Sequence, residues 1–343
     1  MQTYGNRKAS LQKFLVAPIA RAQVGDVFAH VGPITHASGM QMLPNLVMGM
    51  TSLILPGFQP AQFLQAIQDH KVNRVLMVPT MINMLLSVPN FADYDLSSLK
   101  VLTYGAAPMA PALVEKAMDA FGPILVQGYG AGETASIVTL LTAQDHIDAL
   151  QGDRKRLASC GRSYFDTLVE VVNEQGQPVS GTEIGEIRVK GADIMSGYWQ
   201  APNLTEEVII DGYYYTGDLA MVDDEGYIFI VDRKKEMIIS GGFNVYPLEI
   251  EKILYSHDDI FEAAVVGVPD ERWGEAIKAV VVLNPNAKCA EQDIIDYCSE
   301  RLAGYKKPRS VDFAAALPKN GNGKVVRRQV REQYWHNSER KVG

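Results

Sequence analysis

The sequence predicts an α/β protein in which a large domain with a mostly parallel sheet precedes a small α+β domain. Three observations predict this class. Helix-like and strand-like segments alternate over residues 61–127, and short strands separated by turn residues follow over 167–231. Five consecutive charged residues then occupy 232–236. A charged run of this kind remains solvated and marks the junction between two compact regions.

The domain boundary is therefore expected inside the charged run. Residues 1–234 are assigned to the large domain and residues 235–343 to the small one. Within the large domain, residues 1–160 are expected to form α/β layers. Residues 161–234 are expected to form a small β-barrel or antiparallel sheet.

The alternation in the first region supports the parallel sheet. Phe63, Leu64 and Ile67 have helical spacing, and the apolar run 72–78 that follows them indicates a buried strand. The same order then repeats as a strand, a helix that begins with proline, and a strand, at 99–104, 111–121 and 124–127. Strands that alternate with helices favour parallel pairing.

The two later regions have their own elements. Strands are expected in the β-rich region at 168–172, 186–190 and 227–231. After the charged run we expect a helix from Leu248 and a second helix near 293–302. Three further strands are expected at 263–268, 279–283 and 311–313.

Composition excludes several classes of protein. The 343 residues are 47% hydrophobic and carry a net charge of −8, which disfavours a nucleic-acid surface. The three cysteines have neither metal-ligand spacing nor disulfide density, as in reduced cytoplasmic thiols. No secretion signal is recognised, and the most apolar region, 43–58, is interrupted by polar residues and proline. We expect a cytoplasmic protein without a membrane span, and the oligomeric state stays open.

Two glycine-rich segments follow predicted parallel strands. The first contains Gly105, Ala106, Ala107 and Pro108; the second runs over 127–134. Ligands of open α/β sheets bind beyond the carboxyl ends of strands, where small residues allow close backbone approach. Two neighbouring loops of this kind indicate one nucleotide-sized site. Each loop alone is equally well explained as a tight turn.

Further polar segments lie downstream. They contain Asp218 at 214–219, the charged run, the pair Gly241 and Gly242 at 240–251, and Lys324 at 318–328. Taken singly, these segments are explained by turns, a solvated linker and a surface loop. Lys324 does not belong to a phosphate loop of the P-loop type, because Pro318 stands where that motif requires glycine.

The order and spacing of all these segments resemble those of the adenylate-forming superfamily, which includes acyl-CoA synthetases, peptide-synthetase adenylation domains and luciferases. The resemblance extends from about Gly25 to Arg328. It also includes 33–39, where a His or aromatic side chain borders the acyl pocket in the family. In this family a carboxylate attacks the α-phosphate of ATP, and a thiol then captures the acyl group.

The resemblance implies ATP, Mg²⁺ and coenzyme A as substrates or cofactors, and a carboxylic acid, fatty or aryl, as the small-molecule partner. Glu133 is expected to hold Mg²⁺, and Lys324 to bridge carboxylate and phosphate oxygens; both offset negative charge. Asp218 is expected to accept hydrogen bonds from both ribose hydroxyls, and Arg233 is expected to contact ribose or phosphate. The residues expected to enclose the adenine are Gly105, Ala106, Ala107, Pro108, Gln127, Gly128, Tyr129 and Gly130.

The same resemblance implies an acyl pocket bordered by His36, Tyr104 and Gly128. It also implies that the small domain rotates on a hinge at Lys235 between the two half-reactions. Gly241 and Gly242 would then line the narrow tunnel for the pantetheine thiol, where a side chain would obstruct it.

The sequence departs from the family pattern at three places. Gly132 and Asn322 stand where threonine is common, and the first change is expected to weaken phosphate binding. The family's phosphate-gripping loop, ending in Pro-Lys-Gly, is expected just upstream of the segment that resembles 25–39, and Met1–Ser10 does not supply it. The chain is therefore expected to be a fragment with little acyl activation of its own.

Four interpretations remain open at this point. An acyl-CoA ligase is the first. An amino-acid adenylation enzyme is less favoured, because 33–39 lacks the aspartate that pairs with an α-amino group. A luciferase-like oxidase is not separated by these motifs. The last is a fragment that binds nucleotide or CoA without turnover.

Overall fold

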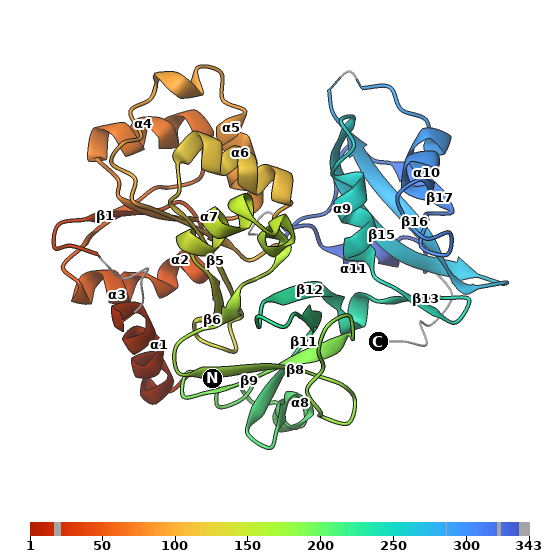
Figure 1. Cartoon of the computed structure of the whole chain (residues 1–343), viewed down its shortest axis with the longest axis horizontal. Helices are drawn as coiled ribbons and strands as arrows, with labels where there is room; N and C mark the ends of the chain where they lie inside the picture. Colours follow the sequence, from red (N-terminus) through yellow and green to blue (C-terminus); the bar gives the residue numbers. More distant parts are fainter. Residues whose placement is uncertain (17–21, 286, 321–323, 336–343) are drawn as a thin grey trace. The chain divides into compact units, whose positions relative to one another are not determined.

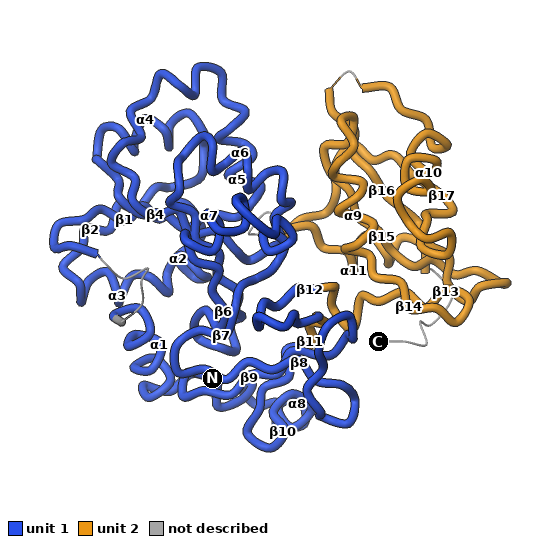
Figure 2. Tube along the Cα trace, viewed as in Figure 1, with its two compact units in different colours: residues 1–216, 221–230 blue, residues 217–220, 231–343 orange. Residues whose placement is uncertain are grey.

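The computed structural model describes residues 1–16, 22–285, 287–320 and 324–335. The chain divides into two compact units (Figure 2). Unit 1 contains 1–216 and 221–230, and unit 2 contains 217–220 and the chain from Val231 onward. The expected boundary after residue 234 differs from this division by a few residues. It also placed 217–220 in the first domain, but Asp218 is ion-paired with Arg233 of unit 2.

Unit 1 is built around a seven-stranded sheet in the order β2-β1-β3-β4-β5-β6-β7. Its first five strands in that order pair in parallel, and β6 and β7 are added antiparallel. The strands are β1 (Val27–His30), β2 (Thr51–Ile54), β3 (Arg74–Met77), β4 (Val101–Gly105), β5 (Leu125–Gly130), β6 (Ile137–Leu141) and β7 (Arg162–Ser163). The mostly parallel sheet predicted from the sequence is confirmed.

Helices cover both faces of this sheet (Figure 1). The main core lies between one face and four helices, α4 (Pro60–His70), α5 (Pro79–Leu86), α6 (Pro111–Phe121) and α7 (Ala143–Gln151). Phe63, Leu64 and Ile67 of α4 are buried in it, as their helical spacing predicts. Near the other face lie α1 (Tyr4–Val16), α2 (Ala37–Met40) and α3 (Met42–Val47). The 3-10 helices are η2 (Phe91–Asp93) and η3 (Arg154–Ala158).

Proline starts several of these helices. It occupies the first turn of α4, α5 and α6, where its fixed φ suits a helix and its missing N–H costs no hydrogen bond. Thr142 starts α7 differently: its hydroxyl accepts from the Asp145 N–H, and the Asp145 carboxylate accepts from the Thr142 N–H. These local signals explain why the helices begin where the sequence indicates.

The β-rich region forms a five-stranded sheet in the order β10-β11-β9-β8, with β12 paired to β11. Its elements are β8 (Thr167–Val172), β9 (Gly185–Gly191), α8 (Pro202–Val208), β10 (Ile209–Ile210), β11 (Tyr213–Val222) and β12 (Ile228–Arg233). The strand pairings recorded for the described residues form an open path, so this subdomain is a sheet. The division between the two units falls within β11 and β12.

Unit 2 contains the α+β fold that the sequence predicts. A five-stranded sheet in the order β14-β13-β16-β15, with β17 beside β16, packs against α9, α10 and α11. The elements are η4 (Lys234–Glu236), β13 (Ile238–Ser240), β14 (Phe243–Val245), α9 (Pro247–Leu254), β15 (Ile260–Asp270), β16 (Gly274–Leu283), α10 (Glu291–Ser299), β17 (Ser310–Phe313) and α11 (Arg327–Glu332). No helix of the described residues is long and apolar enough to cross a membrane.

Candidate active site

The two glycine-rich loops of unit 1 begin on neighbouring strands. Strands β4 and β5 pair in parallel with Gly105 opposite Gly128, so both loops start at the same edge of the sheet. A Cβ on Gly105 would lie 2.3 Å from the carbonyl oxygen of Gly128. A Cβ on Gly128 would in turn lie 2.7 Å from Ile137 Cγ2. Close backbone approach between adjacent strands therefore explains Gly105, and packing against the Ile137 side chain explains Gly128.

The loop after β4 turns sharply away from the sheet. Ala106 has φ +61°, a backbone conformation that L side chains rarely adopt. Ala106 and Pro108 are exposed, whereas Gly105 is buried. In the second loop, Gln127 and Gly128 are buried and Tyr129 is half-buried. Small exposed residues beside buried strand ends leave backbone groups accessible to a ligand.

Glu133 follows β5 in a turn that Thr134 fixes. The Thr134 hydroxyl donates to the carbonyl oxygen of Ser136 at 2.6 Å and accepts the Ala131 N–H at 3.0 Å. Glu133 is half-buried, and its Oε1 accepts a hydrogen bond from the Tyr198 hydroxyl at 2.9 Å. Desolvation and then Glu133 raise the pKa of Tyr198 to about 12, so the phenol stays a donor at neutral pH.

The first residues of the chain lie beside this turn. Gln2 Nε2 donates to the carbonyl oxygen of Gly132 at 2.6 Å, and the Met1 carbonyl oxygen accepts the Ser196 N–H at 3.0 Å. The Met195 N–H donates to the carbonyl oxygen of Glu133 at 2.7 Å. Segments from three regions of the sequence thus meet around the Glu133 turn.

The structure does not place the three expected acyl-pocket residues around one cavity in the described residues. His36 is exposed before α2. Tyr104 is only 1% exposed and belongs to the core, where its hydroxyl lies 2.8 Å from His146 Nε2. Gly128 packs against Ile137. Their role at an acyl pocket stays a prediction.

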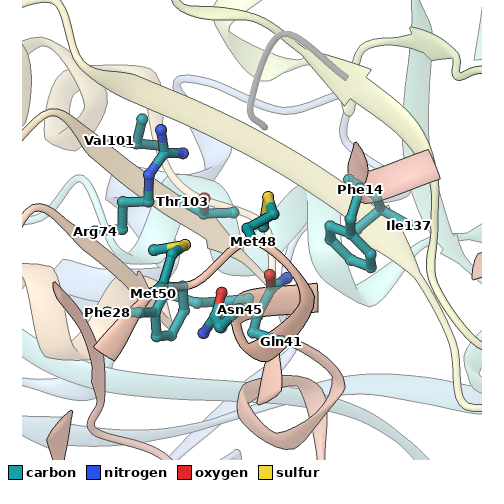
Figure 3. Close-up of a pocket in the computed structure, with 11 residues that line it drawn as sticks. Phe14, Phe28, Gln41, Asn45, Met48, Met50, Arg74, Val101, Thr103 and Ile137 are labelled. Atoms are coloured by element: carbon teal, nitrogen blue, oxygen red, sulfur yellow. The ribbon is translucent and has the colours of Figure 1, made fainter. Parts of the chain in front are cut away.

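A small cavity lies on the face of the sheet opposite α4–α7 (Figure 3). Phe14 of α1 and Thr103 of β4 contribute to its lining, together with Met48 and Met50. Its volume is about 40 Å³. One buried water needs about 10–15 Å³ of such space, so the cavity has room for a few waters at most. The smallest ligand pockets have ~300 Å³. This cavity is therefore too small for the acid.

Unit 2 contains the charged residues that the sequence singles out. Asp218, 7% exposed, forms an ion pair with Arg233, whose Nε lies 3.0 Å from Asp218 Oδ1. Separate contacts with the nucleotide are expected for the two residues, whereas the structure pairs them directly. Lys235 is exposed within the short helix η4.

Lys324 of unit 2 directly precedes Val325, which forms an isolated β-bridge with Lys319. The Lys324 N–H donates to Asn320 Oδ1 at 3.0 Å, and its carbonyl oxygen accepts the Asn320 N–H at 2.9 Å. Although part of the residue is exposed, desolvation and then the positive charges of Arg233 and Arg327 lower the pKa of Lys324. The expectation for Asn322 concerns 321–323, which lie outside the described residues.

The two glycines expected at the thiol tunnel differ in their surroundings. Both have positive φ, +58° at Gly241 and +83° at Gly242. A Cβ on Gly241 would lie 2.5 Å from the Trp273 ring, but a Cβ on Gly242 would meet no described atom within 4 Å. Gly241 is thus restricted by packing and conformation, and Gly242 by its backbone conformation alone.

Sequence reasoning missed two side chains that hold these parts in place, Tyr198 and Arg327. Tyr198 lies in 195–199, a segment with no clear motif. Arg327 lies in the polar segment 318–328, where the sequence indicates a role for Lys324 alone. Arg327 forms ion pairs with Asp232 and Glu251. The signal available for Arg327 was that its two partners also belong to polar segments singled out in the sequence.

A further group of potential metal ligands occurs in unit 2. His257, Asp259 and Cys289 each place one ligand atom within 4.8 Å of the others. However, His257 Nδ1 accepts the Asp259 N–H at 3.1 Å. Burial and then Asp293 and Asp259 raise the pKa of the Cys289 thiol, which disfavours the metal-binding thiolate. The hydrogen-bonded turn at 257–259 accounts for this arrangement.

Comparison with known proteins gives consistent matches along the chain. The sequence profile of AMP-binding enzymes matches residues 1–199, and the profile of the AMP-binding enzyme C-terminal domain matches residues 249–324. A medium/long-chain-fatty-acid–CoA ligase, FadD8 of Mycobacterium tuberculosis, is 39% identical over 318 residues, which are 91% of this chain and 55% of the relative. A feruloyl-CoA synthase of Amycolatopsis is 40% identical over 88% of this chain and 60% of the relative.

Solved structures show the same fold. The amide bond synthetase McbA from Marinactinospora thermotolerans matches with a TM-score of 0.88 and 30% identity over 97% of this chain and 66% of that chain. The o-succinylbenzoate coenzyme A synthetase MenE of Bacillus subtilis, solved with ATP and magnesium ion, matches with a TM-score of 0.84 and 31% identity, over 96% of this chain and 66% of that chain. The chain spans less than two thirds of the length of the relatives described here.

Proposed function

The chain belongs to the family of AMP-binding enzymes, and we propose that it takes part in ATP-dependent synthesis of an acyl-CoA from a carboxylic acid. Membership of the adenylate-forming superfamily, inferred from the ordered motifs, is confirmed. The observation that carries the proposal is the pairing of Gly105 with Gly128, which joins two accessible loops at one sheet edge next to Glu133.

The proposed reaction has two steps. A carboxylate oxygen of the acid bonds to the α-phosphorus of ATP, and the bond from that phosphorus to the bridging oxygen breaks, so that pyrophosphate leaves. The CoA sulfur then bonds to the acyl carbonyl carbon, its thiol proton passes to solvent or a base, and AMP leaves. The first step needs positioning and neutralisation of several negative charges.

Glu133 fits the role of a Mg²⁺ ligand. Its carboxylate is half-buried, and its Oε1 is oriented by the Tyr198 hydroxyl. Among the described residues, no hydrogen bond to Oε2 is recorded, which leaves a hard oxygen available to a hard cation. Bound Mg²⁺ supplies positive charge that offsets phosphate charge. Tyr198 restricts the carboxylate to one orientation.

In unit 2, Lys324 and the Asp218–Arg233 pair are proposed to meet the substrates. Lys324 supplies a positive charge, and its backbone is hydrogen-bonded to Asn320, which suits contact with carboxylate and phosphate oxygens. Asp218 is proposed to accept the ribose hydroxyls and Arg233 to contact ribose or phosphate. Lys235 is proposed as the hinge, since it is exposed within the charged run.

Gly105, Ala106, Ala107, Pro108, Gln127, Gly128, Tyr129 and Gly130 are proposed to enclose the adenine. His36, Tyr104 and Gly128 are proposed to border the acid. Gly241 and Gly242 are proposed to admit the pantetheine thiol.

The proposed acid is a fatty or aryl acid, and the proposed acceptor is CoA. Support comes from the names of two relatives, a fatty-acid–CoA ligase and a feruloyl-CoA synthase. A cytoplasmic location is proposed because Cys160, Cys289 and Cys298 are all free thiols.

Acid-dependent exchange of pyrophosphate into ATP tests this function. We expect exchange with at least one member of a panel of fatty, aryl and amino acids, at a low rate for these 343 residues, and formation of the matching acyl-CoA when CoA is added. Glu133→Gln should lower exchange by about 10²-fold, because a partner of the phosphate charge is lost. The matched control is Glu115→Gln, since Glu115 pairs with Arg154 on the surface of α6.

Two outcomes would favour the other candidates. Exchange with amino acids alone would indicate an amino-acid adenylation enzyme. Absence of exchange with every acid, together with calorimetric binding of a nonhydrolysable acyl-adenylate analogue, would show a chain that binds nucleotide without turnover.

A further inference from the structure

Three polar segments of unit 2, far apart in the sequence, meet at Arg327. Its Nη1 donates to Asp232 Oδ1 at 2.9 Å. Its Nε donates to Glu251 Oε1 at 2.7 Å, and its Nη2 bonds to Glu251 Oε2. Asp232 starts the charged run, Glu251 lies on α9, and Arg327 is the first residue of α11. One guanidinium therefore connects three elements of the unit.

Both carboxylates in this cluster are buried and fully engaged. Asp232 is 2% exposed and accepts the Arg233 and Leu248 N–H groups at 2.7 and 2.6 Å. Glu251 is 5% exposed and accepts the Val265 N–H at 2.9 Å. A buried carboxylate without its cation is strongly unfavourable. The cluster therefore has a defined geometry that depends on the arginine.

The cluster reaches Lys324 through a short β-bridge. Lys319 pairs with Val325, and the Val326 N–H donates to the carbonyl oxygen of Pro318 at 2.8 Å. Val326 caps α11, and Arg327 follows it directly. The backbone of Lys324 is thus hydrogen-bonded to Asn320. Three residues later, Arg327 holds the chain through its ion pairs with Asp232 and Glu251.

We propose that Arg327 is a positioning residue that fixes Lys324 to the hinge-bearing start of unit 2 through Asp232 and Glu251. Asp232 directly precedes Arg233 and lies three residues before the proposed hinge Lys235. Because all three charged partners belong to unit 2, Lys324 turns with that unit as one rigid piece. The catalytic consequence rests on the proposed function, whereas the fixed backbone around Lys324 does not.

Arg328 provides a matched control next to Arg327. Its side chain is 75% exposed, and its recorded ion pair within the described part of the chain is with Glu332, one turn along α11. Exposed pairs of this kind contribute little to stability. Arg327→Lys and Arg328→Lys both keep a positive charge, but only the first removes a guanidinium group that binds buried carboxylates. The lysine replacement also lowers the risk that the unit fails to fold.

Hydrogen exchange of the full chain is the first experiment. In Arg327→Lys we expect the amides of Lys324 and Val326 to exchange about tenfold faster or more, with the β15–β16 core amides unchanged. Arg328→Lys should exchange like the unmodified chain. Unchanged exchange at Lys324 and Val326 in Arg327→Lys would overturn the proposal. Equal acceleration throughout unit 2 would also overturn it, because Arg327 would then act on general stability.

The two half-reactions are the second experiment. Arg327→Lys should lower adenylate formation by about 10²-fold, the effect of misplacing a reacting group by about 1 Å. Acyl transfer from a supplied acyl-adenylate should change little. Equal loss of both half-reactions, or loss of neither, would overturn the positioning role. If the unmodified chain forms no adenylate, the proposed function fails, and hydrogen exchange alone decides whether Arg327 fixes Lys324.

Discussion

Backbone geometry arranges the candidate residues of unit 1, whereas charged side chains arrange those of unit 2. In unit 1, a side chain on Gly105 would collide with the carbonyl oxygen of Gly128 on the neighbouring strand, and one on Gly128 would collide with Ile137 of β6. In unit 2, Arg233 and Arg327 each pair with a buried carboxylate, Asp218 and Asp232 respectively. The arrangement in unit 1 depends on glycines, which have no side chain. The arrangement in unit 2 depends on charged side chains.

This difference predicts how substitutions should disrupt each set of residues. A methyl group added to a glycine of unit 1 should disrupt the packing of the strands at any salt concentration. The unit 2 half should fail through loss of charge, with its fold largely kept where the altered residue is exposed. The two halves can therefore be disabled separately, and the results compared within one set of assays.

The largest effect is expected from Lys324→Ala. Adenylate formation should fall by about 10²–10³-fold, the usual loss on removing one group that stabilises developing charge. Thioester formation from a supplied acyl-adenylate should be spared. Pyrophosphate exchange and thioester assays, run on a preparation whose unmodified form is active, measure the two steps. Equal loss in both steps would contradict the division of roles between two conformations.

The second effect concerns Gly105→Ala. The new Cβ would lie 2.3 Å from the carbonyl oxygen of Gly128, so β4 or β5 must shift. We expect a loss of about 1–3 kcal/mol in the free energy of unfolding, measured by urea denaturation. Gly132→Ala is the control, because its Cβ would meet no described atom within 4 Å. Identical midpoints for the two variants would show that the strands tolerate the contact.

The sequence predicts the backbone half better than the charged half. The two strands that end in Gly105 and Gly128 are consecutive in the sequence. The spacing of apolar residues and the turn residues therefore suffice to predict that the two glycines lie side by side. Tyr198 lies 65 residues from Glu133, and Arg327 lies 76 and 95 residues from its partners. No local pattern encodes such separations. Only the fold shows that these groups meet.

A smaller effect is expected from Gly242→Leu. Its Cβ meets no described atom, but φ +83° makes a side chain strained by about 1–2 kcal/mol. Acyl transfer to CoA should fall by about tenfold or more if the thiol passes this residue, with pyrophosphate exchange nearly unchanged. Gly241→Leu is the comparison, because Trp273 blocks its Cβ and folding itself should suffer. Loss of exchange in Gly242→Leu would assign this glycine to backbone conformation alone.

The smallest effect concerns a titrating group within the backbone half, His146. Its Nδ1 lies 2.7 Å from the carbonyl oxygen of Thr142, so Nδ1–H donates there and Nε2 accepts the Tyr104 hydroxyl. Burial lowers the pKa of His146 below its usual 6.5. The folded chain thus binds this proton less readily than the unfolded chain does. The stability that His146 contributes is complete above about pH 6.5 and is lost as the pH falls toward the depressed folded pKa.

His146→Gln removes the proton site and keeps a group that can bond to the Tyr104 hydroxyl. Between about pH 6.5 and 5, the free energy of unfolding should fall less steeply in this variant than in the unmodified chain. The difference for one group is bounded by about 2 kcal/mol over that interval. Burial also lowers the pKa of His30, which is present in both proteins and therefore cancels in the comparison. Urea denaturation across this pH range measures the two slopes. Parallel slopes would show that His146 does not titrate in this pH range. The stability of unit 1 would then not depend on the charge of this residue.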